Sequence, residues 1–237
     1  MILSAHQPVY LPGIILFNKI AISDVFMFLG HAQLVSHSWH SRNRIRQGDK
    51  ELFLTVPVQT SGRFGQPIDD TRIANSHWKR KHIESIAQSY RKRPFFDAYF
   101  GPIEALLLAD WPSLGTMNKA LIRHLMEVLE IQTPVLESAD YEPKEHKTDL
   151  LIELSKAAGA DGFLSNEGSR VYVREDAMAA AGLNHYWQIF SHPTYEQGRS
   201  FMSNLSVIDL LFNSGPAAAE IVRACGHAEI GAVAQKA

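Results

Sequence analysis

The first 21 residues, MILSAHQPVYLPGIILFNKIA (residues 1–21), join a strand, a stiff loop and a helix. Residues 1–5 are largely apolar and predict a short strand that begins at the first residue. Residues 6–13 contain two prolines, which fix φ and stiffen a turn. Residues 14–21 then place apolar side chains at helical spacing. A strand that leads through a loop into a helix is typical of a parallel α/β sheet, so this stretch decides the fold class.

The same alternation continues along the chain. Further strands are predicted at 25–29, 52–58, 134–136, 162–165 and 185–190, and helices at 77–91, 95–109, 113–129, 148–158, 173–181 and 205–212. We therefore expect an α/β fold with a mostly parallel sheet flanked by helices, an interior strand at residues 1–5 and a helical middle segment. The sequence contains no linker or repeat, so residues 1–237 are expected to form one domain, with residues 77–130 as a candidate helical insertion.

Composition narrows the class of protein and of ligand. The single cysteine, Cys225, cannot form an internal disulfide, and no apolar run approaches the roughly 20 residues that span a bilayer. The N-terminus lacks the basic and apolar regions of a signal peptide, so we expect a cytoplasmic protein without a membrane partner. The net charge is −2, yet residues 36–93 carry 12 Lys and Arg against 5 Asp and Glu. This basic segment favours a small anionic metabolite, whereas nucleic acid is not expected because the chain as a whole is not basic.

Polar residues follow the ends of the predicted strands, where open α/β sheets bind their ligands. His6 ends the first strand and can exchange a proton near neutral pH, so we interpret it as a general base, with Gln7 and Tyr10 as ligand contacts. The alternative is a packed turn with a structural histidine. In this arrangement loops after different strands meet at one edge, which predicts that one pocket contains His6, Gln33, Arg42, Asn43, Ser165 and His192.

The basic segment supplies further candidate contacts. His31, Gln33, Arg42 and Asn43 follow the second strand, and arginine suits bidentate binding of phosphate or carboxylate. Arginines alternate from 42 to 46 and would share one face of an extended segment, either at the site or on a solvated edge strand. The histidines between 31 and 40 lack cysteine or paired carboxylate neighbours, so no metal site is predicted and no cofactor is required by the sequence.

The other candidates lie further along the chain. Lys81 and His82 share a helix and form either a phosphate clamp or a solvated basic face. Asp209 lies in an apolar helix, where a carboxylate is paired or functional, and we take it as a catalytic candidate. The remaining predicted ligand contacts start helices or follow strands: Lys147, Ser165, Tyr172, His192, Tyr195 and Gln197. The sequence contains no dinucleotide fingerprint, phosphate-binding loop or nucleophile elbow.

In these blocks the chain resembles the WbqC-like protein family. The matching segments include His6-Gln7-Pro8-x-Tyr10-Leu11-Pro12, Trp39-x-x-Arg42-Asn43-Arg44-Ile45, Trp78-x-x-Lys81-His82, His192-Pro193-x-Tyr195-x-Gln197 and Leu205-Ser206-x-x-Asp209-Leu210-Leu211-Phe212-Asn213. The match extends over residues 6–215 and departs at Gly30, where relatives often have aspartate, and at Gly13, where an aromatic residue is common.

The resemblance implies a role in bacterial surface-polysaccharide biosynthesis, of the O-antigen type, or in a related small-molecule pathway. The implied activity is a transferase that moves an acyl or aminoacyl group onto an amino sugar or a similar phosphorylated metabolite, with a nucleotide-sugar as a candidate ligand. Two alternatives stay open: a non-catalytic accessory protein that binds the same small molecule, and a nucleotidyltransferase-like enzyme. The oligomeric state is not predicted.

Overall fold

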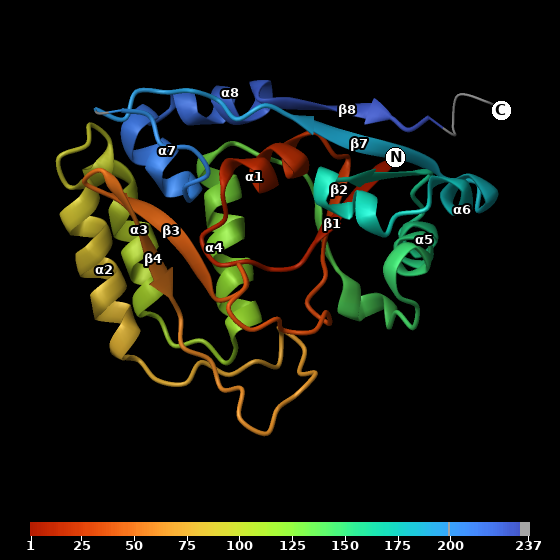
Figure 1. The fold of residues 1–237 in the computed structure, drawn as a ribbon, viewed down its shortest axis with the longest axis horizontal. Helices are drawn as coiled ribbons and strands as arrows, with labels where there is room; N and C mark the ends of the chain where they lie inside the picture. The colour runs from red at the N-terminus through yellow and green to blue at the C-terminus, as the bar shows by residue number, and fades with distance from the viewer. Residues whose placement is uncertain (199, 233–237) are drawn as a thin grey trace.

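The computed structural model describes residues 1–198 and 200–232, and its centre is a six-stranded sheet (Figure 1). The strand order is β5-β2-β1-β6-β7-β8. The strands are β1 (Ile2–His6), β2 (Val25–Phe28), β5 (Val135–Glu137), β6 (Gly162–Ser165), β7 (Asn184–Phe190) and β8 (Gly226–Ile230). The first five pair in parallel, and β8 pairs antiparallel with β7 at one edge. This confirms the mostly parallel α/β fold and the interior position of the first strand.

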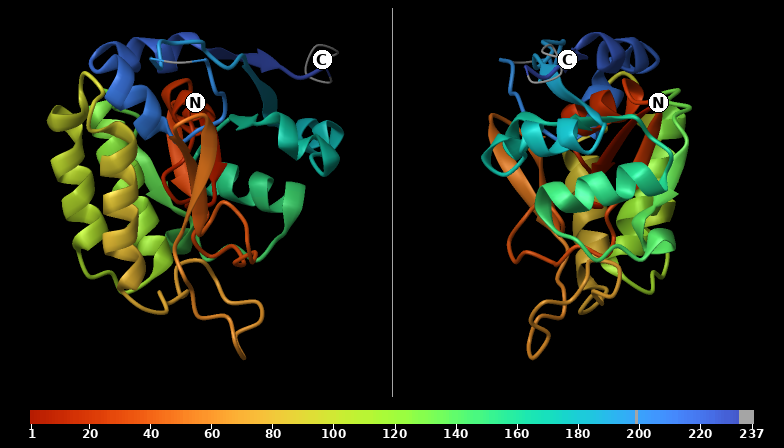
Figure 2. Two further views of the ribbon diagram at one scale, coloured as in Figure 1. Left: turned by 60° about the vertical axis from the view of Figure 1, so that its left-hand side comes forward. Right: turned by 90° about the vertical axis from the view of Figure 1, so that its right-hand side faces the viewer.

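Helices cover both faces of the sheet. They are α1 (Ile14–Ala21), α2 (His77–Tyr90), α3 (Phe96–Leu108), α4 (Leu114–Val128), α5 (Lys147–Ala157), α6 (Glu175–Ala180), α7 (Val207–Ser214) and α8 (Ala217–Ala224), with 3-10 turns η1 (Ser138–Tyr141) and η2 (Glu167–Val171). The predicted helices all form, with ends within about two residues of their expected bounds. Figure 2 shows α2, α3 and α4 side by side at one end of the molecule, which is the predicted helical middle segment.

Side-chain alternation along β1 and β2 divides the core into two clusters. Phe26 and Phe28 join the larger cluster, which includes α1, α2, α3, α4, α7 and α8. Leu3, Ala5 and Met27 point to the opposite face and join a smaller cluster with α5 and α6. Both faces of the interior strands are therefore buried, as a parallel sheet requires.

A separate hairpin contains the alternating arginines. Strands β3 (Arg42–Gln47) and β4 (Lys50–Thr55) pair antiparallel with each other and not with the main sheet. The predicted strand at 52–58 is shifted, because the hairpin turn lies at residues 48–49 and the strand ends at Thr55. The hairpin is anchored by Asn43, Ile45 and Leu54, which are all buried.

The C-terminal pair α8 and β8 was not predicted from the sequence. Gly215 and Pro216, which lie beyond the last predicted helix at residues 205–212, form a tight turn between α7 and α8. Gly215 has φ +54°, and a Cβ there would lie 2.4 Å from the Phe95 ring. Glycine therefore permits a turn that packs against Phe95 and continues the helical layer.

The strand order positions the site. From β1 the chain moves through α1 to β2 on one side, and later returns to β6 on the other side of β1. The order reverses between β1 and β6, and ligands of open α/β sheets bind beyond the carboxyl ends of the strands at such a point. His6 is the last residue of β1 and therefore lies at this position.

Candidate functional site

A cavity of about 490 Å³ opens beyond the carboxyl end of β1. Its lining comes from His6 and Gln7 after β1, the first turn of α1, the segment from Val35 to Arg44, and Phe190 and His192 at the end of β7. Apolar side chains form much of the wall, and a small number of polar groups converge on it. This is the usual composition of a small-molecule site. We call this cavity the His6 pocket.

His6 presents an unbonded ring nitrogen to the His6 pocket. Its Nδ1 lies 2.7 Å from the Gln7 carbonyl oxygen, and a carbonyl can only accept, so Nδ1 bears the proton. Within the described residues Nε2 has no hydrogen-bond partner. Burial lowers the pKa of His6 to about 4, with the Lys19 ammonium as the next cause. The ring is therefore neutral at pH 7.

The other two imidazoles in the pocket are fully bonded. His40 accepts from the Val35 backbone N–H at Nδ1 (3.2 Å) and donates from Nε2 to Gln7 Oε1 (2.8 Å). His192 donates from Nδ1 to the Pro193 carbonyl (2.9 Å) and accepts from the Asn204 backbone N–H at Nε2 (2.9 Å). In each of these two neutral rings, both nitrogens form hydrogen bonds with groups of the protein. Of the three, His6 alone has a nitrogen available to a ligand.

Two buried carboxamides hold the loop that follows His6. Asn43 donates to the carbonyls of Tyr10 (3.2 Å) and Leu11 (2.7 Å), and its oxygen accepts from the Arg44 backbone. Asn118 on α4 donates to the carbonyls of Pro8 (3.1 Å) and His40 (2.8 Å). Asn43 lines the pocket as predicted, but its polar atoms position the loop.

Arg44 is the cation that lines the pocket, whereas Arg42 does not. The Arg44 guanidinium lies 5.7 Å from the centre of the Trp39 ring, donates to the Asn204 carbonyl and pairs with Glu51 at 2.9 Å. Trp39 is 48% exposed, so its indole offers an open surface at the pocket. An exposed tryptophan beside an arginine can support a flat ring and a charged group together.

The predicted contacts Tyr10 and His82 lie in the core. Both are at most 3% exposed, and the Tyr10 hydroxyl lies 2.9 Å from His82 Nδ1. Trp78 packs edge-on against both rings. Lys81, the neighbour of His82, points to solvent on the exposed side of α2. The Tyr10–His82 pair is placed to fix α2 against the His6 loop.

Asp209 is likewise not among the residues that line the His6 pocket. It is fully buried and accepts hydrogen bonds of 2.9 Å from the hydroxyls of Tyr90 and Tyr195 and from Gln197 Nε2. Burial raises its pKa, and these donors act in the opposite direction. Gln197 in turn accepts from Arg46, which is 3% exposed. Asp209, Tyr195 and Gln197 therefore fasten the hairpin and residues 195–197 to α7.

The predicted cluster of six residues forms in part. His6, Asn43 and His192 line the pocket, and Gln33, Arg42 and Ser165 do not. Ser165 is buried and bonds His185 Nε2 at 2.8 Å under α6. Gln33 is exposed and forms a bridge with Pro67. Arg42 packs over Phe53, 5.1 Å from the ring centre. Lys147 is exposed at the start of α5, and the Tyr172 hydroxyl bonds Ser169.

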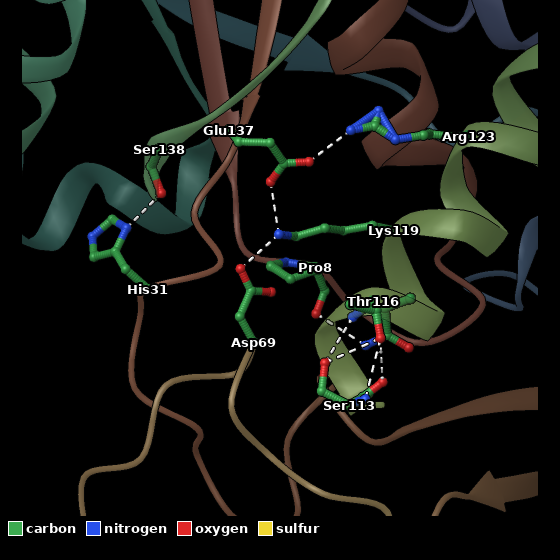
Figure 3. Close-up of polar contacts among 10 residues, drawn as sticks. Pro8, His31, Asp69, Ser113, Thr116, Lys119, Arg123, Glu137 and Ser138 are labelled. Atoms are coloured by element: carbon green, nitrogen blue, oxygen red, sulfur yellow. Dashed lines mark hydrogen bonds and ion pairs between the residues drawn. The ribbon is translucent and has the colours of Figure 1, made fainter. Parts of the chain in front are cut away.

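His31 lies at the carboxyl end of β2, in a second polar cluster (Figure 3). Its Nδ1 is 2.5 Å from the Ser138 hydroxyl, and burial lowers its pKa. Lys119 on α4 bridges Asp69 (2.6 Å) and Glu137 (2.7 Å) beside it. These groups neutralise one another, so the cluster ties α4 to the ends of β2 and β5.

Gly30 makes room for the Asp69 carboxylate. A Cβ on Gly30 would lie 1.9 Å from Asp69 Oδ2. The carboxylate of Asp69, from the loop that ends in α2, therefore occupies the space beside position 30 that a side chain would need.

Sequence reasoning missed several residues that shape the pocket. Trp39, His40 and Arg44 lie in the basic segment at residues 36–93, and no local feature of the sequence distinguishes these lining residues from Arg42. Lys19 lies in the predicted helix at residues 14–21 and was not predicted to lie near the site. It is 4% exposed, donates to the Ala5 carbonyl at 3.0 Å, and burial lowers its pKa to about 7. The sequence signal that could have identified Lys19 is its charge on the apolar side of the predicted helix at residues 14–21.

Across residues 1–198 and 200–232, no helix is both long and apolar enough to cross a bilayer. In the same part of the chain, no group of three or more His, Cys, Asp or Glu side chains is arranged to hold a metal ion.

The fold and the pocket define an α/β protein with a small-molecule-sized cavity at the carboxyl edge of its sheet. The chain belongs to the WbqC-like protein family, whose model matches residues 7–221. It is 30% identical over 224 residues to the uncharacterized protein Rv1507c of Mycobacterium tuberculosis (strain ATCC 25618 / H37Rv), covering 92% of this chain and 96% of that protein. No solved structure matches the chain significantly.

Proposed function

We propose that this protein is a cytoplasmic transferase that moves an acyl or aminoacyl group onto an amino sugar or a similar phosphorylated metabolite. The pathway would be bacterial surface-polysaccharide biosynthesis of the O-antigen type or a related small-molecule pathway. One observation carries the proposal: His6 Nε2 lies in a pocket at the carboxyl edge of the sheet and has no hydrogen-bond partner among the described residues. A neutral imidazole in that position is suited to general-base catalysis.

In the proposed step, the acceptor amine or hydroxyl gives a proton to His6 Nε2 as its nitrogen or oxygen attacks the acyl carbon. The imidazolium then returns the proton to the leaving group of the activated acyl donor. The hydrogen bond from Nδ1 to the Gln7 carbonyl keeps the ring in one tautomer and orientation. A pKa of about 4 makes His6 a weak base, and a bound anion would raise this pKa toward neutrality.

The pocket offers two kinds of ligand contact. Arg44 and the first turn of α1 favour a phosphate or carboxylate, because this turn has neither a side-chain cap nor an acidic residue. Trp39, Val35 and Phe190 supply apolar surface for a sugar ring or an acyl group. A nucleotide-sugar or another phosphorylated sugar combines both features.

One observation favours a second candidate function, a non-catalytic accessory protein that binds the same ligand. His40 and His192 have both ring nitrogens bonded, and Asp209 is buried away from the pocket. His6 therefore has no second free titratable group beside it within the described lining. The two functions share the ligand and differ in turnover.

The test is His6→Ala, with His227→Ala as a control because His227 is an exposed histidine on β8. Turnover and affinity are measured against a panel of nucleotide-linked amino sugars and activated acyl donors. Loss of a general base lowers the rate about 10²–10⁴-fold, while His227→Ala retains wild-type rate. Full activity of folded His6→Ala would refute the role of His6. Binding by the wild type without turnover of any pair would overturn the transferase in favour of the accessory protein.

A further inference from the structure

A second cavity, of about 480 Å³, lies away from the His6 pocket and shares no lining residue with it. It is enclosed by the turn of the β3–β4 hairpin, the last turn of α2 with the two residues Lys92 and Arg93 that follow it, and Gly198. In Figure 1 the α2–α3 turn and the hairpin turn approach each other at the upper left of the molecule. We call this the Arg93 cavity.

The lining of the Arg93 cavity is cationic. Arg46, Lys92 and Arg93 contribute to it, and none of its described lining residues is acidic. Arg46 is buried and donates to the carbonyls of Gly48 (2.8 Å) and Ser200 (2.6 Å), with Asp49 3.5 Å away. Like charges gathered around one cavity repel each other, and an anion between them would relieve that repulsion.

Lys92 and Arg93 differ from the ion-paired cations of the basic segment. Arg44, Lys79 and Arg80 of that segment each pair with a carboxylate at 2.7–2.9 Å. In contrast, the Lys92 and Arg93 side chains have no hydrogen bond or ion pair with any described residue. Among the described residues, the charges of Lys92 and Arg93 therefore have no protein partner at this cavity.

Local packing holds Arg93 in position. A Cβ on Gly198 would lie 2.1 Å from the Arg93 guanidinium nitrogen Nη1, and Gly198 has φ +68°. Glycine therefore permits both the backbone turn and the close approach of the guanidinium. Ser89 adds a hydroxyl that is buried without a partner in the described structure. A buried hydroxyl is unfavourable until it meets an acceptor, such as a phosphate oxygen.

We propose that the Arg93 cavity binds the phosphate or diphosphate group of a small metabolite. Arg93 would bind phosphate oxygens with its guanidinium, Lys92 would add a point charge, and Ser89 would donate one hydrogen bond. The cavity is larger than a phosphate, so the remainder of the metabolite can extend toward the amides of Gln47 and Gln88. The net charge of −2 favours a small ligand over nucleic acid.

The Arg93 cavity is connected to the His6 pocket through shared elements. Arg44 in one and Arg46 in the other lie two residues apart on β3, about 7 Å along the strand. His192 and Asn204 line the His6 pocket, and Gly198 between them in sequence lines the Arg93 cavity. Occupancy of the cavity would therefore brace the strand and the segment that also frame the first site.

The experiment measures pyrophosphate binding by calorimetry at fixed ionic strength, with wild type, Arg93→Gln and Lys92→Gln. Within the described residues Arg93 has no side-chain hydrogen bond or ion pair to lose, so Arg93→Gln should fold normally, which thermal melting checks. The matched control is Arg91→Gln, an equal charge change on an exposed neighbour outside the lining. Arg93→Gln should weaken binding about tenfold or more, since a charge-assisted contact is lost. Arg91→Gln should change it less than about twofold, because exposed charges interact weakly through water.

Equal weakening by Arg91→Gln and Arg93→Gln would overturn the proposal, since it indicates diffuse charge attraction. Absence of pyrophosphate binding by the wild type would also overturn it. Loss of pyrophosphate binding in Arg44→Gln together with its retention in Arg93→Gln would place the anion in the His6 pocket and would also overturn the proposal. Inorganic phosphate, pyrophosphate and a nucleoside diphosphate are compared to identify the ligand class. Tighter binding of a single-stranded oligonucleotide than of all three would contradict a small-metabolite site.

Discussion

Acid should destabilise this protein because it contains histidines that are buried and neutral in the folded state. His82 is the example developed first. His82 is 3% exposed and bonds the Tyr10 hydroxyl at 2.9 Å. Burial lowers its pKa to about 4, with the nearby Lys81 charge as a further cause. The unfolded chain has the ordinary pKa of about 6.5. Between these two pH values unfolding therefore takes up a proton at His82. The contribution of neutral His82 to the free energy of unfolding is fully present above pH 6.5 and is lost as the pH falls toward 4.

The magnitude follows from the two pKa values. Between pH 7 and pH 5, the shift at His82 removes about 2 kcal/mol from the free energy of unfolding. The pKa values of His6 and His185 are also lowered to about 4, mainly by burial. Three such groups would together remove about 5 kcal/mol over the same interval, which is comparable to the whole stability of a marginal domain.

The assay is urea unfolding of wild type and His82→Gln at half-unit steps from pH 7.5 to pH 4.5. His82→Gln should be less stable than wild type at pH 7. Its free energy of unfolding should fall less steeply with decreasing pH than that of wild type, because its unfolding takes up one proton fewer. The difference in slope is near 1.4 kcal/mol per pH unit around pH 5. His227→Gln, at an exposed position, is the control and should keep the wild-type slope. The same slope in His82→Gln and wild type would refute the inference that His82 is held neutral by burial.

Two further perturbations test the packing around the candidate site. Asp209→Ala removes the acceptor of the Tyr90 hydroxyl and of the other buried groups that donate to Asp209. The free energy of unfolding, measured by urea titration, should therefore fall by about 3 kcal/mol or more. Asp140→Ala, at an exposed carboxylate, should change it by less than about 0.5 kcal/mol, and an equal effect would contradict the buried network. Gly30→Ala should cost about 1–3 kcal/mol, because the new Cβ meets the Asp69 carboxylate. Asp69→Ala should suppress that cost in a double-mutant cycle, and strictly additive effects would count against the clash.

The sequence by itself determined the fold class and the position of the proposed base. Short apolar runs, helical spacing and prolines act locally, so β1, α1 and β6 form where the pattern predicted them. The rule that loops after parallel strands meet at one edge then placed His6 and His192 in one pocket. The bounds of most helices were also correct, because their ends depend on nearby residues.

Only the tertiary structure decided which polar residues face a ligand. Tyr10, His82 and Asp209 looked like site residues in sequence, and packing from distant segments buried them, as when Tyr90 meets Asp209 across 119 positions. Likewise, three histidines line one pocket, but backbone groups and Gln7 occupy both nitrogens of His40 and His192 and leave His6 Nε2 unbonded. Periodicity records the face on which a side chain lies. Its burial and its hydrogen-bond partners depend on residues far away in sequence, and these exist as neighbours only once the chain has folded.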